Sequence, residues 1–202
     1  MFKPQFRKTI ILTTKKFNQK STQSKWVLDP SHSEIAFKVK HLMITNVKGI
    51  FKTFEASILT TGDDFMTAEI DFSLDPSSVD TSSADRDAHL KGVDFLDVEN
   101  HKQIIFLANT YENVDGDGSY ELWGDLTIKG ITKRIKLDVE FGGVARDPWG
   151  NVKAGFTING KINRKDFGLV WNAALEAGGV LVSEDVRISC DIQLQKTTEV
   201  EG

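Results

Sequence analysis

The stretch MTAEIDFSL, Met66–Leu74, alternates between apolar and polar residues over its whole length. Successive side chains of a β-strand point to opposite faces of the sheet. The pattern therefore predicts a strand with one face in the core and one face in water. The apolar positions are Met66, Ala68, Ile70, Phe72 and Leu74.

The same period of two recurs along most of the chain. Short polar turns that contain glycine, such as Thr61–Asp64 and Gly130–Lys133, separate several of these segments. Such short links join antiparallel neighbours, because a parallel crossover needs about a dozen residues or more. We therefore expect seven further long strands, whose apolar faces span Ile35–Val39, Phe54–Ile58, Ile104–Ala108, Tyr120–Ile128, Ile135–Phe141, Val152–Ile158 and Val186–Leu194.

Eight one-sided antiparallel strands can form a sandwich or a closed barrel. The strands are long, and closure removes exposed edges, so we favour an all-β, eight-stranded antiparallel barrel. The segment between Leu74 and Ile104 lacks the period of two and predicts a short helical excursion. We expect its helix over Ala84–Lys91, with Thr81 or Ser82 as the N-cap and Gly92 in the C′ position.

Charge is unevenly distributed along the 202 residues. Residues 1–25 hold seven basic and no acidic residues, which leaves 18 basic against 29 acidic residues from Trp26 onward. We expect a disordered basic tail over 1–25, a barrel domain over 26–196 and a short C-terminal tail over 197–202. The excess of acidic residues from Trp26 onward argues against a nucleic-acid partner, because phosphates bind basic surfaces.

The basic N-terminal stretch does not resemble a secretory signal. Its apolar run, Ile10–Leu12, is shorter than the ~7–15 apolar residues of a signal peptide and the ~20 of a spanning helix. We therefore expect a cytoplasmic protein that does not span a membrane. An organelle transit peptide and an anchor for anionic membrane surfaces remain as alternatives for this stretch.

The inner faces of the strands are aliphatic or aromatic. A packed core and a lipid-lined tunnel both fit this pattern, and small inner residues such as Ala56, Ala68, Ala108, Gly124 and Ala154 would leave room for a tunnel. The residues expected to line a ligand cavity are Ile35, Phe37, Val39, Phe54, Ile70, Phe72, Phe106, Leu126, Ile128, Phe156, Ile158 and Phe167.

A histidine ends the inner face of one strand. In DPSHSEIAFKVKH, Asp29–His41, the alternation brings His41 to the apolar side. His41 could fasten the barrel mouth to the helix that carries Asp87 and His89. It could instead belong to a polar collar that binds a ligand head group through His41, His89, Lys129 and Arg164.

A third interpretation is a metal- or acid/base-dependent enzyme that acts on a hydrophobic substrate through His41 and His89. No HxH or HExxH spacing supports a metal site, and the single Cys190 cannot form one alone. We therefore expect no metal site and no catalytic residue.

Several short motifs follow one another along the chain, namely Trp26–Ser33, His41, Gly49–Phe51, Ser78–Thr81, Asp87–Leu90, Asp94–Asp97, Gly124–Lys133 and Arg164–Gly168. In this order and at this spacing they resemble the YceI-like family of polyisoprenoid-binding proteins. Asn100–His101 departs from the family, which usually has a Tyr-Pro-like pair there, and the export signal of many members is not found.

The resemblance implies a lipocalin-like barrel with a long hydrophobic cavity. It implies a non-covalently bound isoprenoid lipid, such as a polyprenyl phosphate or a quinone, with no other cofactor and no established reaction. We accordingly expect a binding protein for carriage, storage or sequestration of that lipid, with a homodimer as one possible state. Many members are periplasmic, which is the alternative location. A filled barrel that serves a structural, stress-linked role is a further alternative.

Overall fold

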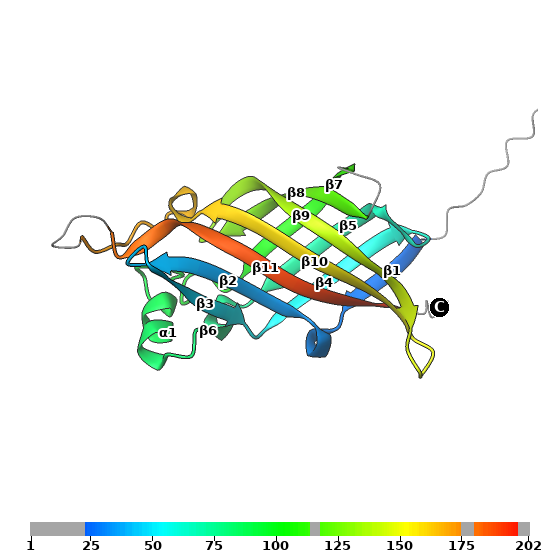
Figure 1. The fold of residues 1–202 in the computed structure, drawn as a ribbon, viewed down its shortest axis with the longest axis horizontal. Coiled ribbons are helices and arrows are strands. Elements are labelled where there is room, and N and C mark those ends of the chain that lie inside the picture. The colour runs from blue at the N-terminus through cyan, green and yellow to red at the C-terminus, as the bar shows by residue number, and fades with distance from the viewer. Residues whose placement is uncertain (1–22, 114–117, 175–179, 198–202) are drawn as a thin grey trace, which may run out of the picture.

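The computed structural model describes residues 23–113, 118–174 and 180–197. This part of the chain forms one long sheet, the helix α1 (Ala84–Lys91) and the 3-10 turns η1 (Pro30–His32), η2 (Pro76–Ser78) and η3 (Arg164–Phe167) (Figure 1). None of its helices has the length and apolarity that crossing a lipid bilayer requires. The strands are β1 (Gln23–Leu28), β2 (Glu34–His41), β3 (Thr45–Phe51), β4 (Phe54–Thr61), β5 (Asp64–Leu74), β6 (Val79–Asp80), β7 (Ile104–Asn113), β8 (Ser119–Ile128), β9 (Ile131–Arg146), β10 (Val152–Asn163) and β11 (Val182–Lys196).

Eight of these strands close into an antiparallel barrel. The ring runs β1-β4-β5-β7-β8-β9-β10-β11 and returns from β11 to β1. The expected eight-stranded antiparallel barrel is therefore confirmed. Its sequence-predicted strands correspond to seven ring members and to β2.

The ring contains β1, which the period of two did not reveal, in place of β2. β11 is long enough to pair with both strands, with β1 through Leu194–Lys196 and with β2 between Val182 and Asp191. β2 then continues the sheet into β3 and β6 beyond the ring. β1 begins at Gln23, inside the stretch assigned to the basic tail, and the rest of that tail, 1–22, lies outside the described residues.

Register shifts move some residues to the opposite face from the one that strict alternation predicts. In β5, Phe65 is buried and Met66 is exposed, so the inward placement predicted for Met66 is wrong. The pairing of β4 with β5 shifts between Leu59 and Thr61, beside these residues. A bulge of this kind reverses the facing of every residue beyond it.

The helix forms where it was predicted, but its caps differ. The N-cap of α1 is Ser83, which makes no side-chain capping bond. The backbone N–H of Thr81 instead donates to Asp87 Oδ1 at 2.9 Å, so the Asp87 side chain fixes the approach to the helix. Gly92 caps the C-terminus with a φ of −72°, outside the left-handed region expected for C′.

One end of the barrel holds β1 and the β9–β10 turn (Figure 1). Aromatic side chains pack against one another at this end. Trp26 is fully buried, and its Nε1 donates to Thr60 Oγ1 at 3.0 Å. The ring of Phe65 lies 4.8 Å from that of Trp26 and 5.0 Å from that of Phe156. We call this the closed end, because large rings with satisfied polar atoms occupy it.

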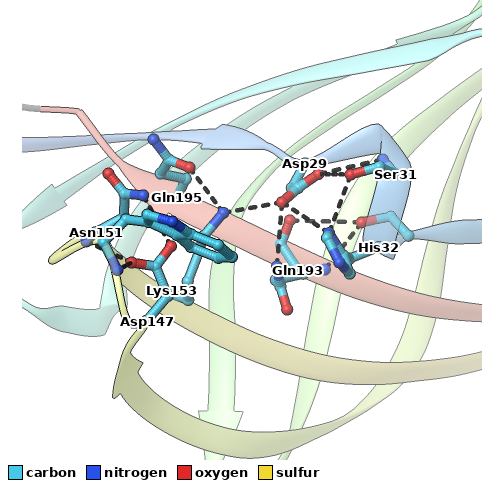
Figure 2. A network of polar contacts seen from close by, with 10 residues as sticks. Asp29, Ser31, His32, Asp147, Asn151, Lys153, Gln193 and Gln195 are labelled. Carbon is cyan, nitrogen blue, oxygen red and sulfur yellow. Dashed lines mark hydrogen bonds and ion pairs between the residues drawn. The ribbon is translucent and has the colours of Figure 1, made fainter.

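A polar network fastens η1 to the outside of the closed end (Figure 2). Asp29 accepts hydrogen bonds from Ser31 Oγ at 2.6 Å, Lys153 Nζ at 2.9 Å and Gln193 Nε2 at 3.1 Å. The bond from Ser31, followed by that from Lys153, holds the pKa of Asp29 far below its ordinary value. The Asp29–His32 part of the Trp26–Ser33 segment thus joins η1 to β10 and β11.

Candidate functional site

The barrel encloses a cavity of about 430 Å³, within the usual range of ligand pockets, roughly 300–1,000 Å³. Its wall is almost entirely hydrocarbon and runs from Phe156 and Leu194 near the closed end to Trp171 and Leu181 at the other. We call this second end the mouth. The interior is therefore not a completely filled core.

Most of the residues expected to line a cavity lie in its wall. Phe54 and Phe167 do not: Phe54 packs against the core from a partly buried position, and Phe167 is buried in η3. The others all contribute to the wall, namely Ile35, Phe37, Val39, Ile70, Phe72, Phe106, Leu126, Ile128, Phe156 and Ile158.

The small inner residues do not all widen the cavity. Ala56 and Ala68 are part of its wall. The space beside Gly124 is occupied, because a Cβ there would lie 2.5 Å from the Phe106 ring and 2.7 Å from the Ala108 Cβ. Gly124 thus makes room for an aromatic ring of the core, and the expectation that it leaves space for a ligand is wrong.

Arg164 is the most unusual residue of the cavity wall. It begins η3 and is 3% exposed. Its Nε donates to the Ser183 carbonyl at 2.9 Å, and its Nη1 donates to the carbonyls of Trp171, at 2.8 Å, and Leu169. These carbonyls fix the plane of the guanidinium group at the mouth.

The charge of Arg164 is not balanced by an ion pair. No carboxylate of the described residues lies within ion-pair distance, and the nearby Glu184 pairs with Lys165. Burial lowers the pKa of Arg164, yet an arginine stays charged at neutral pH. Its Nη2 is buried without a hydrogen-bond partner in the described part of the chain. The mouth therefore holds a buried cation with an unused donor.

His89 is also part of the cavity wall and is partly exposed to solvent. Its Nε2 lies 3.1 Å from Asp94 Oδ2. The ring meets those of Trp171, at 4.7 Å, and Phe95, at 5.0 Å, edge to face. These contacts attach α1 to the segment that follows η3.

His41 also belongs to the cavity wall, but it does not fasten the helix. Its backbone pairs with Thr45 and Val182, and no described residue hydrogen-bonds to its ring. Lys129 is not part of the wall and donates outside it to the Val93 carbonyl at 3.2 Å. Of the predicted polar collar, the structure brings His41, His89 and Arg164 to the mouth and leaves Lys129 away from it.

The residues described form no group of three or more His, Cys, Asp or Glu side chains that could hold a metal ion. His89 pairs with Asp94, and no contact joins it to His41. The two histidines of the enzyme interpretation are thus not assembled into one centre.

Two tyrosines in the cavity wall were not predicted as site residues. Tyr111 Oη donates to the Ala68 carbonyl at 2.9 Å, and the Tyr120 ring lies 5.8 Å from that of Tyr111. Burial raises the pKa of both phenols, that of Tyr120 to about 12, so both stay protonated at neutral pH. They add two phenol groups to the few polar side chains of the wall.

Alternation already placed Tyr120 on an inner face, so the sequence could have identified it as a wall residue. Strict alternation would place Tyr111 on the outer face, but the register of β7 with β8 shifts between Ala108 and Thr110 and turns it inward. Arg86 and Trp171, also in the wall, come from segments without a period of two.

A closed antiparallel barrel around an apolar cavity with one polar mouth defines the lipocalin-like class of barrels. The comparison with family models then identifies the branch, since residues 26–194 match the YceI-like domain. The chain therefore belongs to the YceI-like family.

Individual relatives agree with this assignment. A UPF0312 protein of Staphylococcus epidermidis is 38% identical over 172 residues, which cover 84% of this chain and 96% of the relative. The YceI protein of Campylobacter jejuni is 34% identical with a TM-score of 0.66, over 80% of this chain and 91% of that one. A polyisoprenoid-binding domain from Saccharophagus degradans, 13% identical, shares the fold with a TM-score of 0.59, over 85% of this chain and 98% of that one.

Proposed function

We propose that this protein binds a long-chain isoprenoid lipid, with the tail in the barrel cavity and the polar head at the mouth, for carriage, storage or sequestration. The observation that carries the proposal is the buried guanidinium of Arg164, whose Nη2 has no hydrogen-bond partner among the described residues, at the polar end of a hydrocarbon-lined cavity. A ligand with one charged or carbonyl-bearing end and a long apolar end matches both features. A polyprenyl phosphate has such a charged end, and an isoprenoid quinone has such a carbonyl-bearing end.

The tail supplies most of the binding free energy. Each CH₂ group removed from water contributes about 0.8 kcal/mol, which is about 4 kcal/mol for a five-carbon unit before ordering costs. β11 alone is 15 residues long, roughly 50 Å of strand at about 3.4 Å per residue. Because barrel strands tilt by about 35–45°, this strand spans roughly 36–42 Å along the barrel axis, enough to cover several isoprene units.

The unpaired Nη2 of Arg164 adds to the binding free energy of the head group. A hydrogen bond to a charged group contributes about 1.5–3 kcal/mol, and leaving a buried donor unpaired has a cost of similar size. A phosphate or carbonyl oxygen at Nη2 would satisfy that donor, and a phosphate would also balance the charge. His89 and His41, in the same wall, are further polar groups for the head.

The comparisons support an isoprenoid over other lipids only through the family and through one structural neighbour named for polyisoprenoid binding. No contact among the described residues favours the enzyme interpretation. A fatty acid or another acyl lipid would fit the same hydrocarbon wall, and the experiment below distinguishes these ligands by mass.

Denaturing mass spectrometry of lipid extracted from the purified full chain tests the proposal directly. We expect a stoichiometric isoprenoid. Polyprenyl phosphate added to delipidated protein at about 100 times its Kd should stabilise the fold by about 2.7 kcal/mol, a rise in Tm of roughly 5–10 °C.

A pair of variants on β4 separates cavity binding from surface adsorption. Ala56→Trp places a large ring in the cavity and should abolish both the bound lipid and the Tm response, whereas Glu55→Trp on the outer face should retain both. Extracts without stoichiometric isoprenoid, together with a Tm that does not respond to polyprenyl phosphate, would contradict the proposal. A stoichiometric acyl lipid would contradict its isoprenoid part.

A further inference from the structure

The mouth carries large apolar side chains on its outer surface. The turn between β2 and β3 exposes Met43 by 52% and Ile44 by 82%. In Figure 1 this turn lies beside the described parts of the segment between η3 and β11, residues 168–174 and 180–181, at the end of the barrel away from β1. We call the exposed residues of these two segments the apolar rim, which consists of Leu42, Met43, Ile44, Val170 and Val180.

The backbone of the β2–β3 turn holds these side chains outward under strain. Ile44 N donates to the His41 carbonyl at 3.2 Å, and both central residues have positive φ, 52° at Leu42 and 59° at Met43. Such positions favour Asn and Gly, because a Cβ clashes there. A further bond, from Leu42 N to the Leu181 carbonyl at 2.8 Å, ties the turn to the second segment of the rim.

Four cations lie side by side on the outer face behind the rim. Lys48, Lys38, Arg187 and Lys161 stand directly opposite one another on the adjacent strands β3, β2, β11 and β10. We call this row the basic band. Lys161 pairs with Asp185 at 3.1 Å, but no described carboxylate lies within ion-pair distance of the other three. Like charges opposite each other weaken a sheet, so the band favours an anionic partner.

The rim and the band are spaced to fit the interface of a lipid bilayer. Lys38 precedes Leu42 by four residues, about 13 Å of strand. Since barrel strands tilt by about 35–45°, the band stands about 10 Å above the tip of the turn. The head-group layer of one leaflet is roughly 5–8 Å thick, and the Debye length is about 8 Å in physiological salt. With the rim at the acyl boundary, the band therefore reaches the lipid phosphates.

The charge of the rest of the barrel favours an orientation in which the rim and the band face the bilayer. From Trp26 onward the chain has 18 basic and 29 acidic residues, so an anionic surface repels most of its other faces. Asp85 and Asp94, exposed on the α1 side of the mouth, place that side away from the phosphates. The β2–β3 side faces them.

We propose that the mouth end docks onto anionic lipid bilayers, with the apolar rim in the interface and the basic band against the head groups. This orientation directs the cavity toward the membrane. The docking surface goes beyond the proposed function and does not depend on it, because vesicle binding requires neither the cavity nor Arg164.

Sedimentation of the full chain with lipid vesicles tests the docking surface. We expect binding to vesicles of equimolar phosphatidylcholine and phosphatidylglycerol, weak binding to pure phosphatidylcholine, and loss of binding near 1 M salt, where the Debye length is about 3 Å. Neutralising Lys38 and Lys48 together to Gln should weaken binding about 20- to 30-fold, at about fivefold per charge. Ile44→Ser should weaken it by about tenfold or more.

Two substitutions at the closed end serve as matched controls. Trp149, in the β9–β10 turn, is 84% exposed, and Lys25 is exposed on β1. Trp149→Ser and Lys25→Gln should leave vesicle binding unchanged. Absence of binding to the anionic vesicles at low salt, equal binding to both compositions, or loss through Trp149→Ser but not Ile44→Ser would each overturn the proposal. Arg164→Met separates the two proposals, since it should spare vesicle binding while weakening polyprenyl phosphate binding.

Discussion

The closed end and the mouth of this barrel differ in the hydrogen bonding of Trp26, Asp29 and Arg164. At the closed end, Trp26 donates to Thr60, and Asp29 accepts bonds from three side chains. At the mouth, Arg164 keeps a buried donor, Nη2, that has no hydrogen-bond partner in the described part of the chain. Satisfied polar groups stabilise a fold, whereas unsatisfied ones lower its stability until a ligand binds. The contrast fits the proposal that the mouth receives the ligand head group, while the closed end stabilises the barrel.

The strongest test of the comparison removes the central ring of the closed end. Trp26→Ala should lower the free energy of unfolding by about 3–5 kcal/mol, because it deletes a fully buried side chain and its bond to Thr60. Trp149→Ala, at an exposed tryptophan of the same end, should change it by less than about 0.5 kcal/mol. Urea unfolding measures both. Similar losses in the two variants would show that Trp26 does not close the barrel as described.

At the mouth, the corresponding test separates binding from stability. Arg164→Met should lower the affinity for polyprenyl phosphate by about 10- to 100-fold, which corresponds to the loss of a hydrogen bond to a charged group. The affinity for an isoprenoid hydrocarbon should stay unchanged. Calorimetric titration with the two ligands measures the difference. The variant also leaves the Ser183 and Trp171 carbonyls without their donor, so some loss of stability is expected. Equal weakening of the two ligands would assign Arg164 a purely structural role.

The Asp29 network predicts a pH dependence. The folded-state pKa of Asp29 lies below its ordinary value of 3.8, so its contribution is fully present above pH 3.8 and is lost as the pH falls through the folded pKa. Asp29→Asn should therefore cost about 1–3 kcal/mol at neutral pH and progressively less in acid. Denaturant unfolding of both proteins across that range gives the difference. A cost that grows in acid would contradict the network.

The smallest expected effect concerns the strained turn at the mouth. Met43→Gly relieves a positive φ of 59° and should raise the free energy of unfolding by up to about 1 kcal/mol, less the entropy that glycine adds to the unfolded chain. The same substitution removes part of the apolar rim, so vesicle binding should weaken as stability rises. Met66→Gly, at an exposed methionine inside β5, should instead destabilise the fold.

Local pattern predicted the strands and the helix well, because side-chain alternation and turn chemistry are properties of neighbouring residues. It could not predict which strand closes the ring. The pairing of β1 with β11 joins Leu28 to Leu194, and nothing near Leu28 encodes that contact. Bulges limited prediction from the local pattern further, since the shift between Ala108 and Thr110 turns Tyr111 inward.

The candidate site shows the same limit. Long inner faces made most wall residues predictable, and Arg164 was named as a donor. Its three carbonyl partners and its free Nη2 depend on how η3 meets β11, which no local pattern contains. Lys129 was named as a cationic donor of the same collar, but it lies in the β8–β9 turn and bonds to the Val93 carbonyl, a long-range contact that no local pattern contains.

The double pairing of β11 has a consequence for how the protein is made. This strand, Val182–Lys196, bonds to β10, β1 and β2, so all three keep an open edge until the C-terminal part of the chain has been synthesised. Contacts of such long sequence separation make folding slow, and open edges expose a growing chain to aggregation. The cavity is completed only after translation reaches β11, so no ligand can be enclosed on the ribosome before that point.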